Sequence, residues 1–208
     1  MAMIGGVDMT QGRRIGRPRE FDADEVLDRA MVVFWEQGYD AVSLTDLTRA
    51  MGIGKTSMYG AFGNKEQLFR VVLERYADGP GSYGTRALQE PRARQVGEAY
   101  LSGAVLASTR PDCPRGCLGV MGFLSAGRLG QEARDALNAW RDKQRLGLRD
   151  RFRQAVDEGD LPSDCDPDSL AVYLMTLANG IAVQAAGGAD HADLQLAVGA
   201  AMRNWPSV

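Results

Sequence analysis

Residues 21–69 decide the fold, and they read FDADEVLDRAMVVFWEQGYDAVSLTDLTRAMGIGKTSMYGAFGNKEQLF. Apolar residues recur here every three or four positions, which is the period of amphipathic helices. Ser43 can cap a second helix, with Asp46 returning the hydrogen bond. Gly52-Ile53-Gly54 leaves room only for a tight turn before a third helix. The stretch therefore predicts three short helices and the start of a fourth, which Asn64 caps.

The third helix, expected from about Lys55 to Phe62, has two faces of different chemistry. Met58 and Phe62 are four residues apart, so they share a face that we assign to the core. Lys55, Thr56, Ser57 and Tyr59 lie largely away from that face, and all four can donate hydrogen bonds to phosphates or base edges. A helix displayed in this way on two supporting helices fits the major groove of DNA.

A cationic arm precedes this unit and consists of four arginines, Arg13, Arg14, Arg17 and Arg19, with no acid among them. Homeodomain-like units place such arms in the minor groove. The net charge of −3 is a weak objection, because local clusters attract phosphate more than the total charge does. A plain helical packing unit with a polar surface is the alternative, and the arm favours DNA binding.

Between Arg17 and Tyr76 the chain resembles the tetracycline-repressor (TetR) type of transcriptional regulator. The resemblance rests on Gly52-Ile53-Gly54-Lys55-Thr56-Ser57-Met58-Tyr59, followed by Phe62, Lys65, Leu68 and Phe69. It implies that Tyr59 and Lys65 contact phosphates, that residues 55–57 approach the bases, and that Ser43 and Thr45 touch the DNA backbone. Gly54 departs from the family pattern, which usually has a serine cap there, so we expect weaker capping of the third helix.

Length and composition suit a globular protein with a sizeable core, since 45% of the 208 residues are hydrophobic and 25% are charged. By its pattern, no apolar run approaches the length of a membrane span, and no signal-peptide core follows Arg13 and Arg14. Three cysteines, an odd number, argue against a disulfide framework and favour a reducing compartment. We therefore expect a cytoplasmic protein.

A glycine-rich break over residues 78–84 predicts a domain boundary. The expected organisation is a flexible basic arm (1–20), a helix-turn-helix DNA-binding domain (21–77), and an effector-binding and dimerisation domain (78–208). Beyond the break, the apolar periods predict further helices at 91–109, 117–128, 130–158, 167–187 and 190–204. No alternating strand pattern occurs, so we predict an all-α fold.

The last two of these helices are rich in apolar residues, and the one from Asp168 is apolar nearly all round. Such a helix needs cover on every side. A single-chain core provides that cover in one reading, and a four-helix interface between two chains provides it in the other. The resemblance implies the second reading, and a twofold homodimer would match the half-sites of a palindromic operator.

The resemblance also implies a pocket in the second domain whose occupancy by a small-molecule effector releases the DNA. Candidate lining residues are Leu101, Val105, Met121, Phe123, Leu124, Trp140 and Tyr173, although each of them also suits an ordinary core position. The function that follows is a ligand-responsive regulator of transcription, most often a repressor in this family. Its partners would be a double-stranded DNA operator, a small-molecule effector and a second copy of the chain.

The segment Cys113-Pro114-Arg115-Gly116-Cys117 supplies an alternative trigger. Its proline and glycine predict a loop that enters a helix, where the helix dipole and Arg115 would lower the pKa of the Cys117 thiol. Cys113 and Cys117 would then form a sensor of oxidants or electrophiles. In the opposing interpretation Cys117 is a small buried packing residue and Cys113 a passive loop thiol.

Enzymatic chemistry finds no support in the sequence. It contains no phosphate-binding glycine loop and no cluster with the spacing of metal ligands. His191 is the only histidine, which leaves no plausible Ser-His-Asp arrangement. We therefore expect neither catalytic activity nor a cofactor or metal.

Overall fold

The computed structural model describes residues 22–124 and 130–207, except for the side chain of Phe123. Within these residues every regular element is a helix, which confirms the predicted all-α class. The arm residues Arg13, Arg14, Arg17 and Arg19 lie outside the described residues.

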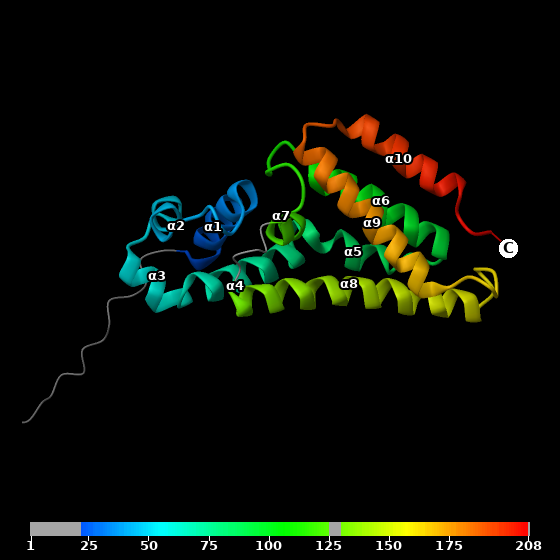
Figure 1. Ribbon diagram of the computed structural model, residues 1–208, viewed down its shortest axis with the longest axis horizontal. Helices are drawn as coiled ribbons and strands as arrows, with labels where there is room; N and C mark the ends of the chain where they lie inside the picture. The colour runs from blue at the N-terminus through cyan, green and yellow to red at the C-terminus, as the bar shows by residue number, and fades with distance from the viewer. Residues whose placement is uncertain (1–21, 125–129, 208) are drawn as a thin grey trace, which may run out of the picture.

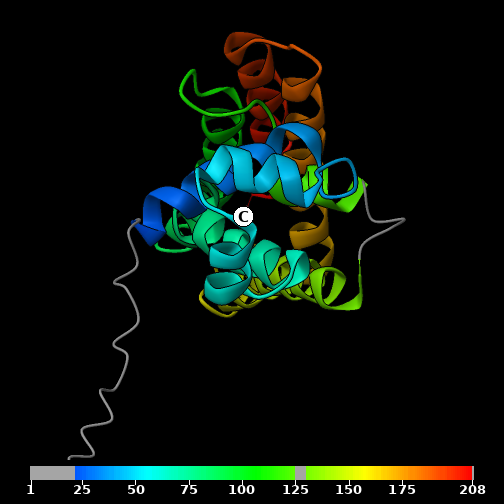
Figure 2. The same ribbon diagram turned by 90° about the vertical axis from the view of Figure 1, so that its left-hand side faces the viewer.

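Eleven helical segments follow one another along the described chain (Figure 1). They are α1 (Ala23–Gln37), α2 (Leu44–Met51), α3 (Lys55–Phe62), α4 (Lys65–Asp78), the 3-10 turn η1 (Pro80–Ser82), α5 (Tyr83–Ala87), α6 (Ala93–Thr109), α7 (Leu118–Leu124), α8 (Gln131–Asp157), α9 (Pro167–Ala186) and α10 (His191–Arg203). Helices α2 and α3 lie at one end of the long axis, and α9 and α10 lie in the other half (Figure 1). Figure 2 looks onto the first end and shows α1 to α4 in front of the remaining helices.

The predicted helix boundaries of the N-terminal unit are confirmed by their caps. The backbone N–H of Asp46 donates to Ser43 Oγ, and the backbone N–H of Ser43 donates to the Asp46 carboxylate, both over 3.1 Å. Gly52 ends α2 in the left-handed conformation at φ 69° and ψ 24°, which glycine adopts without strain. Gly54 is the N-cap residue of α3 and makes no side-chain hydrogen bond to it, which confirms the expected weaker capping.

The glycine-rich stretch after α4 is more ordered than a plain break, since it holds η1 and α5. Gly81 shows why composition did not predict these two segments. A Cβ there would lie 2.7 Å from a ring carbon of Tyr76, so this glycine allows close packing onto α4. Composition alone cannot distinguish a glycine that makes room for a ring from one that interrupts a helix.

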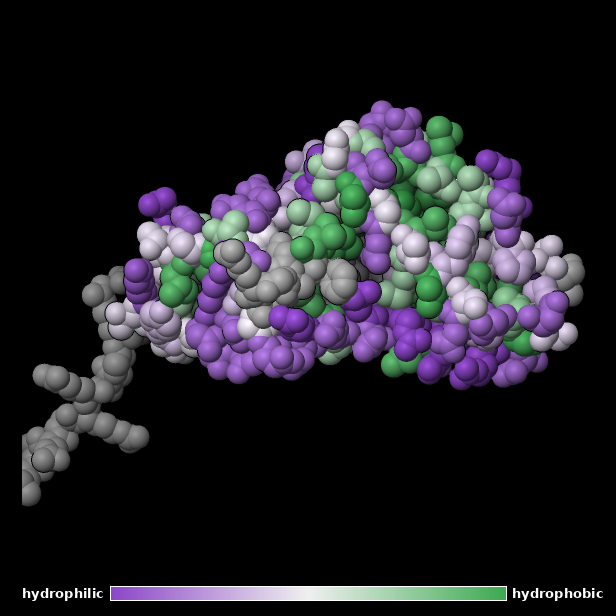
Figure 3. Space-filling view, viewed as in Figure 1, coloured by the Kyte–Doolittle hydropathy of each residue, from purple (hydrophilic) through white to green (hydrophobic). Residues whose placement is uncertain are grey.

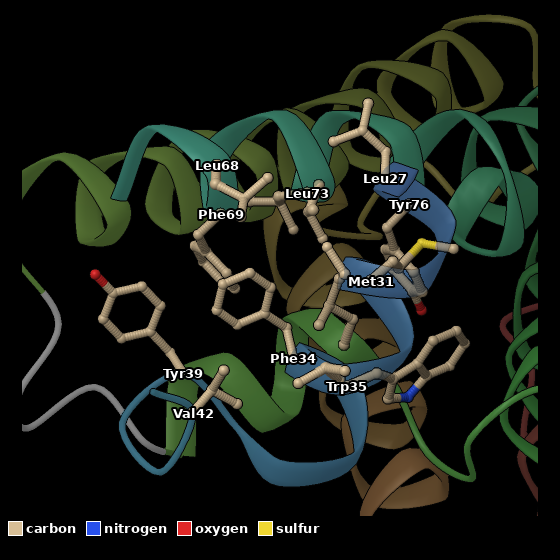
Figure 4. Packing of buried hydrophobic residues seen from close by; sticks show 14 of the residues in the cluster. Leu27, Met31, Phe34, Trp35, Tyr39, Val42, Leu68, Phe69, Leu73 and Tyr76 are labelled. Carbon is tan, nitrogen blue, oxygen red and sulfur yellow. The ribbon is translucent and has the colours of Figure 1, made fainter. Parts of the chain in front are cut away.

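Two apolar cores hold the molecule together. The first contains the aromatic side chains Phe34, Tyr39 and Phe69, with ring centroids of Phe69 5.2 Å from Phe34 and 5.1 Å from Tyr39 (Figure 4). This core also takes in side chains from the later helices, Cys117, Leu118, Ala133, Leu137 and Ala182. The second core joins α6, α8, α9 and α10. The N-terminal helices therefore share their core with α7, α8 and α9.

Helix α9 corrects one expectation from the sequence. Pro167–Ala186 is long and apolar enough to cross a membrane by length and composition, whereas the sequence pattern suggested no such run. Length and composition are weak evidence, because the core helix of a soluble protein meets the same criteria. Helix α9 packs against α6 and α8, which accounts for its apolar character.

Candidate functional site

Helix α3 presents one polar face to solvent, as its sequence predicts. Lys55, Thr56 and Ser57 are exposed, and Tyr59 is 48% exposed despite its large ring. Met58 between them is fully buried in the first core. The helix is therefore held by one face while four hydrogen-bond donors remain available on the other.

Lys65 begins α4 beside this surface and rests on an aromatic ring. Its ammonium nitrogen lies 4.2 Å from the centroid of Tyr39, within the range of a cation–π contact. Burial lowers the pKa of Lys65, while the charge of Asp40 acts in the opposite direction. Burial, with the charges of Glu66 and Asp40, raises the pKa of Tyr39 to about 12. The Lys65 cation is thus positioned at the start of α4 by the ring beneath it.

Ser43 and Thr45 are both exposed at the start of α2. The Ser43 hydroxyl is already engaged, because it donates to the Asp46 carboxylate over 2.5 Å. Hydrogen bonds from the Ser43 hydroxyl and backbone lower the pKa of Asp46, so this acid stays ionised beside the predicted DNA contact. The capping box therefore fixes Ser43 in place and leaves Thr45 as the more available hydroxyl.

A cavity of about 440 Å³ lies in the second half of the chain, among residues of α5 to α9. Its polar wall residues include two phenols, Tyr83 and Tyr100, and three amides, Gln144, Asn179 and Gln184. The ring of Trp140 forms another part of the wall. Apolar walls with a few convergent polar groups are typical of small-molecule sites, and the volume falls within their usual range of about 300–1,000 Å³.

The cavity wall is connected to the N-terminal core through Tyr76 of α4. The Tyr76 hydroxyl donates to Cys117 Sγ over 3.2 Å, and Cys117 lines the cavity. The Tyr76 ring packs edge-on against Trp140 at 6.2 Å and against Trp35 of α1 at 5.0 Å. Figure 4 shows Tyr76 reaching from α4 toward Trp35. One side chain therefore contacts both the cavity wall and α1, the helix that packs against α2.

Helices α9 and α10 expose large apolar side chains, namely Val172 (49% exposed), Tyr173 (42%), Val183 (45%) and Leu196 (72%). Hydrophobic side chains are visible over this part of the molecule in Figure 3. Gathered apolar exposure of this kind marks an interaction surface more often than an ordinary solvated face.

Two family models match the chain. One, described as bacterial regulatory proteins of the tetR family, matches residues 26–72. The other, described as a tetracyclin repressor-like C-terminal domain, matches residues 94–201. The chain belongs to the TetR family. It is therefore a DNA-binding regulator of transcription.

Individual relatives agree with this assignment. The HTH-type transcriptional repressor ComR of Escherichia coli is 32% identical over 195 residues, which cover 93% of each chain. The repressor BdcR of the same species is 37% identical over 121 residues, 55% of this chain and 57% of BdcR. A structure of the TetR-family regulator CifR, a cysteine-substituted variant complexed with 26-base-pair operator DNA, is 40% identical with a TM-score of 0.86. That match covers 91% of this chain and 100% of the other.

The residues proposed from the sequence for the effector pocket of this TetR-family chain are scattered. Leu124 and Trp140 line the cavity. Leu101 and Val105 are buried in the second core and are not part of this wall. Met121 packs against the first core, Tyr173 is exposed on α9, and the side chain of Phe123 is outside the described atoms.

Several residues of the cavity wall were not predicted from the sequence. Tyr83 lies within the glycine-rich break at the predicted domain boundary, and Tyr100 looks like an ordinary core aromatic of α6. Asn179 and Gln184 did leave a signal, since they are polar residues in an otherwise apolar helix. A polar side chain in such a setting needs a hydrogen-bond partner or a cavity.

The structure does not favour the alternative of a reactive thiol at Cys117, and it agrees with the interpretation of Cys117 as a buried packing residue. Cys117 is only 4% exposed, and burial raises the pKa of its thiol despite the hydrogen bond from Tyr76, which acts in the opposite direction. Burial also raises the pKa of Cys113. Arg115 donates to the carbonyl of Ala185 at the end of α9 and to that of Ala189 in the loop that follows. Its guanidinium therefore stabilises the C-terminus of this helix. The predicted loop is present, but thiol sensing is not favoured.

Proposed function

We propose that this chain is a ligand-responsive repressor that binds a palindromic operator as a homodimer and leaves it when a small molecule fills the cavity. The polar face of α3 carries the proposal, because four exposed donors stand over a fully buried Met58. Relatives named as repressors, and the operator complex of CifR, support this reading. A cytoplasmic location and a boundary near residue 78 between DNA-binding and effector domains complete the proposal.

The DNA-facing residues divide into two roles. Lys55, Thr56 and Ser57 stand near the start of α3, which is the part of a recognition helix that reads base edges. We infer phosphate contacts from Tyr59, from Lys65 and from Ser43 and Thr45 of α2, all of which are near the polar face of α3 or at the start of α2. The arginine arm would add contacts in the minor groove. Phosphate contacts set the position of the protein on DNA, and base contacts set its sequence preference.

Dimerisation through α9 and α10 would cover the exposed side chains Val172, Tyr173, Val183 and Leu196. Gly180 on α9 is exposed and would let a partner helix approach closely. A groove of about 170 Å³ between α9 and α10, lined in part by Leu194 and Val198, would receive side chains of the second copy. Twofold symmetry of the protein would then match twofold symmetry of the operator.

Tyr76 provides the route by which the cavity can influence DNA binding. A molecule that displaces Trp140 or Cys117 must also displace the Tyr76 ring or break its hydrogen bond. Because Tyr76 is on α4, such a shift would change the position of Lys65 at the other end of the same helix. Two heads whose spacing no longer fits the half-sites would lose the operator.

A mobility-shift assay with the DNA that flanks the gene tests the function, and absence of a shift at low salt would count strongly against it. Lys65→Ala should weaken binding to all sequences and reduce the slope of log K against log salt by about one. Thr56→Ala should instead change the preferred sequence. Lys143→Ala is the matched control, since this exposed lysine of α8 lies away from α3.

A further inference from the structure

The described wall of the cavity carries a positive charge and no negative one. Arg141 of α8 is the only wall residue with a formal charge among the described residues, and no aspartate or glutamate lines the cavity there. A cationic ligand would have to leave water without gaining a carboxylate partner, which is unfavourable in a partly buried site. An anionic group would instead meet a guanidinium, which suits planar carboxylates.

The neutral polar groups of the wall favour the same kind of ligand. Burial raises the pKa of both Tyr83 and Tyr100, so their hydroxyls remain protonated at neutral pH and can donate. These two phenol donors line the wall together with Arg141, and both kinds of group favour hydrogen-bond acceptors on the ligand.

The remainder of the wall is apolar and partly aromatic. Val120, Met175 and Ala178 line it together with the rings of Trp140 and the two tyrosines. A Cβ at Gly119 would overlap the six-membered ring of Trp140, so this glycine lets the indole lie directly against α7. Aromatic rings on the wall favour a ligand with a flat apolar body.

We propose that the cavity binds a small molecule with an aromatic or otherwise flat apolar body and a single carboxylate or similar anionic acceptor group, and that it rejects cations. Arg141 is the residue that selects the charge, and the phenols of Tyr83 and Tyr100 hold the acceptor or a second polar substituent. This inference rests on the proposed function only in taking the cavity as the effector site.

The test uses three probes with the same bicyclic body and different head groups: 2-naphthoate, 2-naphthalenemethanol and 2-naphthylmethylammonium. Binding to the full chain is measured by calorimetry at pH 7.5 without DNA, and a benzoate, benzyl alcohol and benzylammonium series repeats it with a smaller body. We expect the carboxylate to bind at least tenfold more tightly than the alcohol, with the ammonium weakest. Equal or stronger binding of the ammonium, or binding by none of the six probes, would overturn the proposal.

Variants then locate the selectivity. Arg141→Gln should reduce carboxylate binding at least tenfold and change alcohol binding less than threefold. Lys143→Gln, which removes the same charge two residues away outside the cavity, should change neither. Val120→Phe should block all three probes, and Met175→Phe serves the same purpose if the first variant does not fold by circular dichroism. Retained carboxylate preference in Arg141→Gln would contradict the role of Arg141.

The same proteins separate this inference from the proposed function. Operator affinity is measured by fluorescence anisotropy with and without saturating 2-naphthoate. A chain that binds the carboxylate selectively but never binds DNA would overturn the proposed function and leave the ligand class intact. A chain that binds its operator and prefers the ammonium probe would overturn the ligand class and leave the proposed function intact.

Discussion

The DNA-facing end and the cavity half of this chain are built in opposite ways. At the DNA-facing end the side chains proposed to bind DNA are outside, on short helices over a buried core. In the other half they face inward, onto a space enclosed by segments that are far apart in the sequence. Exposed polar residues on a periodic helix can be recognised locally, whereas a cavity depends on how whole helices meet. Tyr76 is one of the residues through which the two regions are in contact.

The largest test asks whether the two halves are one folding unit. Phe69→Ala in the first core and Phe152→Ala in the second both truncate fully buried rings, so each should lower the free energy of unfolding by about 3–5 kcal/mol. Because the first core includes residues of α7, α8 and α9, we expect one cooperative transition by both far-UV circular dichroism and tryptophan fluorescence. An early separate transition in Phe69→Ala would show that the N-terminal unit folds alone. Val32→Ala, at an exposed position of α1, should stay within about 0.5 kcal/mol.

A smaller test concerns the contact between the halves. Tyr76→Phe keeps the ring but removes the hydrogen bond to Cys117, which should cost about 0.5–1.5 kcal/mol in urea unfolding. The same variant should bind operator with a reduced response to a cavity ligand, because one of the contacts between α4 and the wall is gone. Tyr59→Phe is the contrasting control: it should leave stability unchanged and affect DNA binding only. An unchanged ligand response in Tyr76→Phe would argue against the route through Tyr76.

A third test uses pH within the N-terminal unit, where Arg75 near the end of α4 pairs with Asp28 of α1. Hydrogen bonds from Arg75 lower the pKa of Asp28, against the opposing effect of burial. The folded-state pKa is thus below the ordinary value of about 3.9, so this contribution is complete above that pH and is lost as the pH falls through the lower folded value. The pair is largely exposed, so its contribution should be at most about 1 kcal/mol.

Asp28→Asn should be less stable than the parent chain at pH 6, and the difference in unfolding temperature between the two should become smaller as the pH is lowered to 3. Thermal unfolding measures this difference. Glu36→Gln, which changes another exposed acid of α1, is the matched control. A constant gap between Asp28→Asn and the parent across this range would show that the ion pair contributes nothing to folding.

The smallest expected effect is a gain. Gly54 has the extended backbone of an N-cap residue, φ −73° and ψ 158°, and a Cβ there would meet nothing within 4 Å. Gly54→Ser should supply the missing cap and raise stability by a few tenths of a kcal/mol in urea unfolding. Gly54→Ala has the same backbone restriction without the hydroxyl and should show no such gain. Destabilisation by the serine would mean that the hydroxyl does not reach the backbone of α3.

Local patterns were sufficient to predict the N-terminal unit. Ser43, Gly52 and Asn64 mark helix ends through interactions within four residues, so the sequence contains both partners of each cap. The buried Met58 and exposed Lys55 followed from helical period alone. The helices expected at 91–109, 130–158, 167–187 and 190–204 were also predicted closely, because each has a long apolar period. Of the helix expected at 117–128, the described part is helical over Leu118–Leu124, and residues 125–128 lie outside the described residues.

The cavity could not be predicted in this way. Leu101 and Trp140 are both apolar residues on helices, yet only Trp140 faces the cavity. The difference depends on the rotation of α6 and α8 about their axes, which no local pattern encodes. Cys117 shows the same limit for electrostatics: the nearby arginine was evident from the sequence, but the direction of its side chain toward the end of α9 was not.

The core that α1 and α4 share with α7, α8 and α9 also constrains how such regulators can be recombined. In a hybrid repressor joined at Gly79, the N-terminal part would come from one protein and the remainder from another. Phe69, Leu73 and Tyr76 would then pack against the α7, α8 and α9 side chains of the other protein. Exchange of operator specificity between relatives should therefore succeed when only the exposed residues of α2 and α3 are transplanted. The part of this molecule that can be exchanged between relatives is therefore a set of surface residues. The buried residues beneath them should be kept from the protein that receives the exchange.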